Sequence, residues 1–187
     1  MEKISLREYF QQLGDLEAPV SYTNLVNLSN LAEEEITLFK KMWVIVPVSR
    51  RQQILSRLLE VSEDNLDVNF DRVFYCCISD SDPEIRATAV EGLGESESTD
   101  YISVLIKSIE HDPSLKVRIA ATMALSKYTL LAEMGSIQAS KKRDIERVLI
   151  KLVNDTKEDE ELRRRALEAV SVMSIPEAKL LIEKAYR

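Results

Sequence analysis

The stretch SDPEIRATAVEGL, residues 81–93, decides the fold, because similar stretches return twice further along the chain. Residues 111–125 read HDPSLKVRIAATMAL, and residues 160–170 read EELRRRALEAV. Aligned on one arginine each, the copies share an apolar residue before it, an alanine three positions later and a leucine or valine seven positions later. At ~100° per residue these positions lie on one side of a helix, so each copy predicts an amphipathic helix. The aligned residues are Arg86, Arg118 and Arg163; Ile85, Val117 and Leu162; Ala89, Ala121 and Ala166; and Leu93, Leu125 and Val170.

Start signals precede the predicted helices. In Asp82-Pro83 and Asp112-Pro113 the aspartate can cap free backbone N–H groups, and proline suits the first helical turn. The third copy lacks Asp-Pro, and acidic residues of the segment 154–161 favour its helix dipole instead.

Further amphipathic helices separate the copies. Residues 101–109, YISVLIKSI, and residues 145–153, IERVLIKLV, each place four aliphatic side chains on one stripe. The repeating unit is therefore helix, tight turn, helix. It returns after 32 residues, from 86 to 118, and then after 45, from 118 to 163, and the longer spacing predicts an extended helix and a loop at Gly135 within residues 129–144. Periods of this size predict a stacked array in which no single pair buries its apolar side alone.

The pattern D-P-x-[IV]-R-x-x-A-x-x-x-L resembles the HEAT repeat, particularly the short kind named after the phycobilisome lyases. The resemblance covers residues 65–187 well and 32–64 weakly. It implies an all-α fold, a right-handed α-solenoid of stacked antiparallel helix pairs. It also implies a ladder of aspartates and arginines between consecutive units, which assigns structural roles to Asp82, Arg86, Asp112, Arg118 and Arg163.

The domain organisation follows from this array. We expect a helical cap at 1–31 and a repeat array at 32–187, with units at 32–63, 66–96, 99–133 and 139–174 and an incomplete unit at 176–187. The apolar residues of the incomplete unit predict self-association or further repeats: Leu180, Leu181, Ile182 and Ala185. In the N-terminal part, Ile36, Phe39, Trp43 and Val46 form a predicted buried stripe, and we expect Trp43, the sole tryptophan, in the core.

The search for catalytic chemistry gives few candidates. The sole histidine, His111, lies at an inter-helix turn, and glycines at 14, 92, 94 and 135 cannot form a glycine-rich phosphate loop. The adjacent Cys76 and Cys77 predict buried or half-buried thiols, with a redox pair as the alternative. We therefore expect no enzyme activity, no cofactor and no metal site.

Charge and hydropathy limit the partner classes. The net charge of −7 speaks against a duplex-binding protein, although basic clusters at 141–151 and 163–165 leave an anionic partner such as a phosphate backbone open. The longest apolar run, residues 42–48, is too short to span a bilayer, and the N-terminus lacks the apolar run of a signal peptide. We expect a cytoplasmic protein that does not bind membranes.

The side of each second helix that lies opposite the predicted core is the expected binding face, on the concave side of the array. Most of its residues are polar, but Ile119 and Met123 form an apolar spot, which predicts a protein anchor; a tilted helix that buries them is the alternative. The main interpretation is a non-catalytic protein-interaction scaffold. A nucleic-acid-associated protein and an enzyme or subunit like the phycobilisome lyases are the alternatives. The predicted partner-binding residues are Glu84, Glu91, Lys116, Ile119, Met123, Arg164 and Glu168, and Ala87, Gly94, Ser126, Glu161 and Ser171 complete the face.

Overall fold

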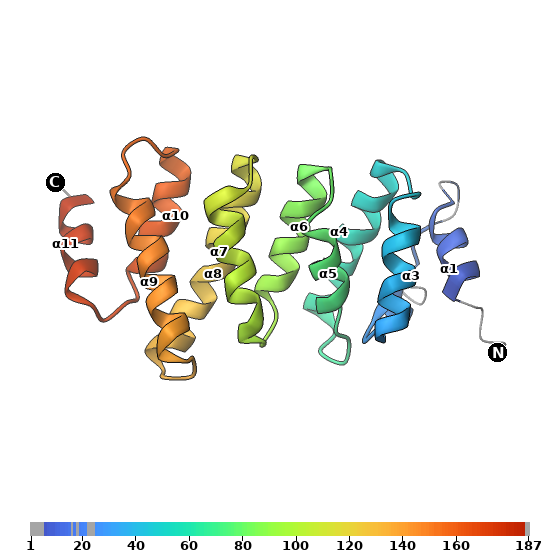
Figure 1. Ribbon diagram of the computed structural model, residues 1–187, viewed down its shortest axis with the longest axis horizontal. Helices are drawn as coiled ribbons and strands as arrows, with labels where there is room; N and C mark the ends of the chain where they lie inside the picture. Colours follow the sequence, from blue (N-terminus) through green and yellow to red (C-terminus); the bar gives the residue numbers. More distant parts are fainter. Residues whose placement is uncertain (1–5, 16, 18, 22–24, 186–187) are drawn as a thin grey trace. The chain divides into compact units, whose positions relative to one another are not determined.

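The computed structural model describes residues 6–15, 17, 19–21 and 25–185, and every regular element in these ranges is helical. The chain divides into two compact units, Met1–Gly92 and Leu93–Arg187. The first contains α1 (Leu6–Leu13), η1 (Val26–Leu28), α3 (Glu33–Trp43), α4 (Val48–Asp64), α5 (Asp71–Cys77) and most of α6 (Pro83–Gly94). The second contains η2 (Thr99–Tyr101), α7 (Ile102–His111), α8 (Leu115–Glu133), α9 (Ala139–Asn154), α10 (Glu160–Val170) and α11 (Pro176–Ala185), as labelled in Figure 1.

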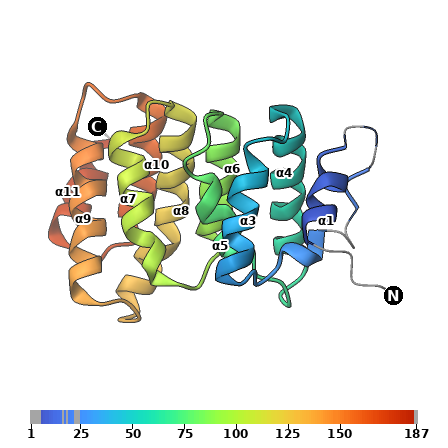
Figure 2. The same ribbon diagram turned by 45° about the vertical axis from the view of Figure 1, so that its right-hand side comes forward.

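The second unit consists of stacked helix pairs. Helix α8 packs against α7, α9 and α10, while α7 also packs against α9 (Figure 2). The first helices of successive pairs are thus neighbours, as are the second helices. This confirms the predicted all-α fold of packed helix pairs.

The core of both units contains the residues that the repeat pattern selected. The positions one before, three after and seven after each aligned arginine are all buried. The four aliphatic residues of α7 and the four of α9 are buried as well, which confirms both predicted stripes: Ile102, Leu105, Ile106 and Ile109; and Ile145, Val148, Leu149 and Leu152. Each such aliphatic side chain contributes roughly 1.5–3 kcal/mol when it leaves water.

The helix starts follow the sequence in two of the three copies. Pro83 is the first residue of α6, and Asp82 Oδ1 accepts a hydrogen bond from the Ile85 amide at 3.1 Å. At α10, Asp159 accepts from the amides of residues 161 and 162. The prediction for the second copy was wrong: α8 begins at Leu115, after Pro113, and Asp112 accepts from the amide of residue 114 at 2.8 Å. The reason is spacing, because Asp112 stands six residues before Arg118, whereas Asp82 stands four before Arg86.

The longer spacing between the second and third copies is accommodated as predicted. Helix α8 continues to Glu133, and the chain turns at Gly135, whose φ of +75° is a conformation that favours glycine. The insertion thus lengthens α8 and leaves the next pair, α9 and α10, in register.

In the first unit, α3 carries the predicted buried stripe of Ile36, Phe39, Trp43 and Val46. The Trp43 ring stacks on Phe39 with centroids 5.0 Å apart, and its Nε1–H donates to Asp80 Oδ2 at 2.8 Å. The prediction that Trp43 belongs to the core is confirmed.

Both ends of the chain reach beyond the described residues. Within the cap expected at 1–31, the described elements are α1 and η1, with Leu13 and Leu28 buried. At the other end, Leu181 on α11 is buried, Ile182 is half-buried and Leu180 is 65% exposed. The side chain of Ala185 lies outside the described residues.

Candidate protein-binding surface

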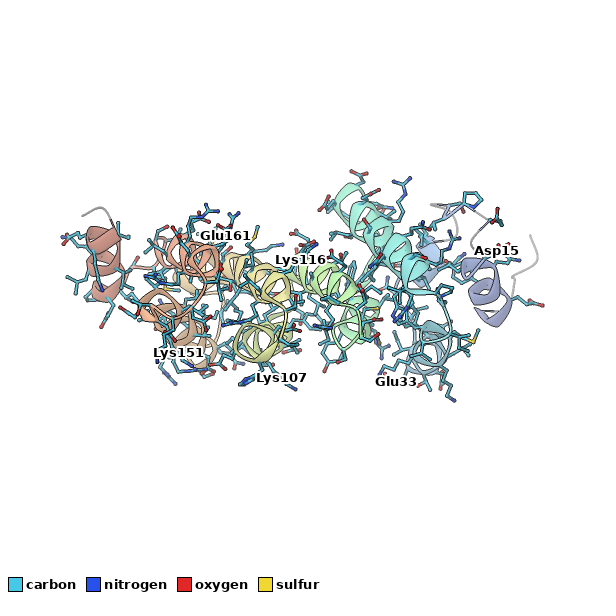
Figure 3. All side chains as sticks on the ribbon, turned by 90° about the horizontal axis from the view of Figure 1, so that it is seen from above. Asp15, Glu33, Lys107, Lys116, Lys151 and Glu161 are labelled. Atoms are coloured by element: carbon cyan, nitrogen blue, oxygen red, sulfur yellow. The ribbon has the colours of Figure 1, made fainter. Side chains whose placement is uncertain are left out.

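The second unit has two distinct helical faces. In Figure 3, Lys116 of α8 and Glu161 of α10 project on one side, while Lys107 of α7 and Lys151 of α9 project on the other. The second helices α8 and α10 are packed neighbours, so their outer sides form one continuous surface. The sequence predicted the binding face of the second and third copies on these outer sides of α8 and α10.

Helix α8 and its C-cap residue Met134 present an apolar stripe on this surface, called the α8 stripe and defined as Leu115, Ile119, Met123, Leu130 and Met134. Met123, Leu130 and Met134 are 48%, 56% and 69% exposed, and Ile119 is half-buried. At ~100° per residue the five positions fall within about 100° of one another. The predicted spot at Ile119 and Met123 is therefore part of a longer exposed stripe. Leu130 and Met134 continue its period, but they lie in the insertion at 129–144 and were not recognised as surface residues.

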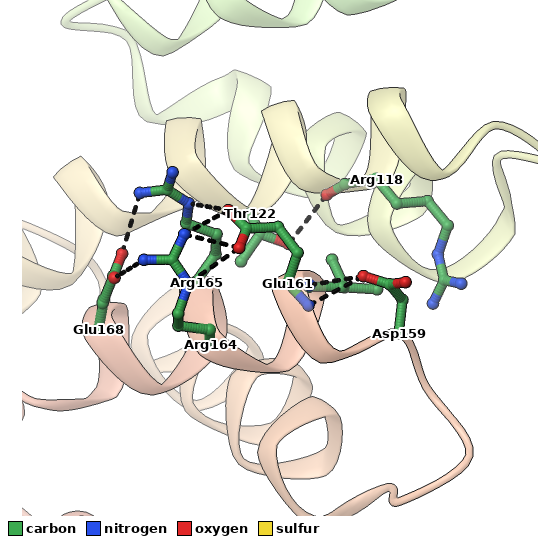
Figure 4. Close-up of polar contacts among 8 residues, drawn as sticks. Arg118, Thr122, Asp159, Glu161, Arg164, Arg165 and Glu168 are labelled. Atoms are coloured by element: carbon green, nitrogen blue, oxygen red, sulfur yellow. Dashed lines mark hydrogen bonds and ion pairs between the residues drawn. The ribbon is translucent and has the colours of Figure 1, made fainter.

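Helix α10 contributes a cluster of four charged residues, called the α10 cluster: Glu161, Arg164, Arg165 and Glu168. Arg164 contacts Glu161 at 2.6 Å and Glu168 at 3.0 Å, and Arg165 contacts the same carboxylates at 2.9 and 3.2 Å (Figure 4). The hydrogen bond from Arg164 lowers the pKa of Glu161, and the reverse contact raises the pKa of Arg164. The sequence placed Glu161, Arg164 and Glu168 on the predicted face; the i, i+3 and i, i+4 spacing of opposite charges would have added Arg165.

The first copy provides only part of the exposed face that was predicted. Glu84 and Glu91 on α6 are exposed, but Ala87, between them along the helix, is 1% exposed. Gly94 is buried too, and a Cβ there would lie 2.7 Å from Ala124 Cβ. Residues without bulky side chains let neighbouring atoms approach closely, so this side of α6 is covered. The prediction that Ala87 and Gly94 are solvated was wrong.

The remaining predicted surface residues in the second unit accompany the stripe. Lys116 is exposed near the start of α8, Ser126 is half-buried one turn after Met123, and Ser171 is exposed where α10 ends. Lys127, beside the stripe, pairs with Glu95 at 3.2 Å. The surface is therefore an apolar stripe bordered by charged and hydroxyl groups, the composition that protein interfaces favour.

The basic cluster at 141–151 is largely paired with acids of this chain. Lys142 contacts Glu133 at 2.8 Å, and this bond lowers the pKa of Glu133 and raises that of Lys142. Further pairs join Lys141 to Asp100, Lys142 to Glu146, Arg147 to Glu110 and Asp144, and Lys151 to Glu110. These pairs favour solvated helix faces over a phosphate-binding surface.

The arginines predicted to form the ladder make well-defined contacts. Arg118 donates from its two terminal nitrogens to Glu158 at 2.9 and 2.6 Å and from Nε to the Ile109 carbonyl at 2.7 Å. Arg86 donates to the Asp80 carbonyl at 2.9 Å. Asp82 accepts from Gln52 at 3.0 Å, which lowers the pKa of Asp82.

Two carboxylates that bind ladder-type arginines were missed. Glu158 binds Arg118. Asp80 binds Arg51 of α4, which has Leu58 seven positions later, as the aligned arginines have a leucine or valine. Both acids lie in the segment before the next second helix, six residues before Arg86 for Asp80 and five before Arg163 for Glu158. The Asp-Pro motif predicted Asp82 and Asp112 in this role instead.

No catalytic or metal centre is evident among the residues that the structure describes. They contain no group of three histidines, cysteines or acids placed to hold a metal ion. His111 is exposed at the end of α7. Cys76 is half-buried and Cys77 is buried, both thiols are free, and burial raises the pKa of each. No described helix combines the length and hydropathy that crossing a membrane requires.

Comparison with known proteins agrees with this architecture. No curated protein matches the chain. A family model of HEAT repeats matches residues 71–136, which run from the start of α5 through α8 to the turn at Gly135. Over these residues, the chain is similar to HEAT repeats.

Proposed function

We propose that this protein is a non-catalytic interaction scaffold that binds a protein partner through the α8 stripe and the α10 cluster. HEAT repeats commonly serve as protein-interaction scaffolds and are generally non-catalytic. The observation that carries the proposal is the α8 stripe, because three large apolar side chains stay exposed on one side of a single helix. Apolar groups gathered in this way favour burial against a partner. We also propose the repeat boundaries and the partner-binding residues that the sequence predicts.

The adjoining charges define how a partner would be oriented. The α10 cluster holds two arginines and two glutamates in fixed ion pairs beside the stripe. A partner that places apolar side chains on the stripe can align its own polar groups with this cluster, which favours specificity more than affinity. Within the described residues, no observation favours nucleic-acid binding or lyase-like chemistry over this function.

The test replaces two exposed residues of the stripe, Met123→Asp with Leu130→Asp. We expect the loss of partner capture from native lysate, because charges on the stripe must be desolvated in the complex. The free energy of unfolding should change by less than about 0.5 kcal/mol for each substitution, because both side chains are exposed. Quantitative mass spectrometry of the captured proteins and a thermal melt are the two measurements.

The matched control is Leu66→Asp, because Leu66 is 96% exposed in the first unit and lies outside the surface. Proteins that this control retains and the stripe variant loses are the specific partners. Equal capture by the stripe variant and the wild type would contradict the proposal. A large fall in melting temperature would show instead that the stripe is part of the core.

A further inference from the structure

Two arginines on second helices bind a carboxylate that comes from the segment before the next second helix. In the first unit, Arg51 of α4 pairs with Asp80, which lies between α5 and α6. In the second unit, Arg118 of α8 pairs in bidentate geometry with Glu158, which lies between α9 and α10. The same arrangement therefore occurs in both units, with a different acid in each.

Arg163 of α10 occupies the equivalent position but has no such carboxylate among the residues that the structure describes. Its Nε donates to the Val153 carbonyl at 3.4 Å, as Arg118 Nε donates to the Ile109 carbonyl. The Arg163 side chain is half-buried, and its terminal nitrogens bind no described residue. The equivalent terminal nitrogens of Arg118 donate hydrogen bonds to Glu158.

A cavity of about 400 Å³ lies beside Arg163, between α9, α10 and α11. Leu167 and Leu181 contribute apolar walls, and Lys184 adds a second, exposed cation. Arg164 also lines the cavity but is already paired with the acids of the α10 cluster. Among the residues that line the cavity, Glu160 is the acid. The two positive charges of Arg163 and Lys184 therefore exceed its single negative charge.

We propose that this cavity binds an acidic peptide segment of a protein partner, with an aspartate or glutamate carboxylate on Arg163 and a neighbouring apolar side chain against Leu167 and Leu181. The carboxylate takes the place that Glu158 occupies on Arg118, and Lys184 supplies the second charge. Bidentate arginine–carboxylate pairs are short and strong, which suits them to this recognition. The inference rests on the proposed function because the segment belongs to a protein partner, but it uses a separate site from the α8 stripe.

The probe is a synthetic peptide with the sequence of residues 155–162, DTKEDEEL, because this segment carries Glu158 to Arg118 and ends in a leucine. Its fluorescent derivative is titrated with the full chain at low salt, and binding is followed by anisotropy. We expect saturable binding that Arg163→Gln weakens at least tenfold and that Arg163→Lys, which keeps the charge but loses the fork, weakens less. Replacing the glutamate equivalent to Glu158 by glutamine in the peptide should weaken binding to a similar degree.

The controls separate this site from the others. Lys179→Gln, an exposed change on α11 outside the cavity lining, should bind the peptide as the wild type does. Met123→Asp with Leu130→Asp should also bind it normally, so that a failure of the proposed function and a failure of this inference give different results. Thermal melts confirm that each variant is folded.

Four outcomes overturn the inference. The first is an absence of saturable binding by the wild type, and the second is equal binding by Arg163→Gln. The third is dimerisation in sedimentation velocity that Arg163→Gln abolishes, because the carboxylate would then come from a second copy of this chain. Competition by inorganic phosphate as strong as that by the unlabelled peptide would likewise reduce the site to a general anion site.

Discussion

Asp80→Ala is expected to lower the free energy of unfolding by about 3–5 kcal/mol, because it leaves the buried Arg51 guanidinium without its counter-charge. The Asp80 and Arg51 side chains are 1% and 9% exposed. The same carboxylate accepts the Trp43 indole N–H at 2.8 Å, and Arg51 Nε is buried without a described partner. The guanidinium therefore depends on Asp80, and urea unfolding followed by the fluorescence of Trp43 reports directly on this network.

The comparison variant is Asp82→Ala, two residues further along the chain. It removes a helix cap that is part-buried, and we expect a loss of about 1 kcal/mol. The double change Arg51→Met with Asp80→Leu removes both charges and should be more stable than Asp80→Ala alone. If Asp80→Ala unfolds at the same urea concentration as Asp82→Ala, the pair is not buried as described.

Gly92→Ala is expected to destabilise the protein by about 1–3 kcal/mol, although alanine is the better helix former. A Cβ at residue 92 would lie 2.5 Å from the nearest atom of the Phe74 ring. The ring is 1% exposed and cannot swing into solvent, so the steric cost exceeds the gain of up to about 1 kcal/mol in helix propensity. The midpoint and slope of urea unfolding measure the net effect.

A double-mutant cycle with Phe74→Leu assigns the cause. The combined variant should lose less stability than the sum of the two single losses, because the smaller side chain relieves the overlap with the new methyl group. Glu91→Ala, an exposed change on the same helix, should alter stability by no more than about 0.5 kcal/mol. A more stable Gly92→Ala protein would show that the α5–α6 contact is looser than described.

The repeat pattern predicted the helices and their buried sides well, and it predicted contacts less well. Ile85, Val117 and Leu162 were placed in the core from spacing alone, because helical periodicity is a local property of the sequence. The carboxylates on Arg51 and Arg118 were not identified, because they come from segments 29 and 40 residues away. Which of several acids in such a segment reaches the arginine depends on the path of the backbone in the tertiary structure.

The sequence by itself determined that the chain forms amphipathic helix pairs, where the core residues lie on each helix, and that the insertion near Gly135 is tolerated. Only the tertiary structure decided which outer sides stay exposed. Ala87 and Arg164 occupy equivalent positions, one residue after the aligned arginine, yet Ala87 is buried and Arg164 is exposed. Exposure is set by what packs against a helix, so the side left uncovered depends on neighbouring helices that a single segment does not encode.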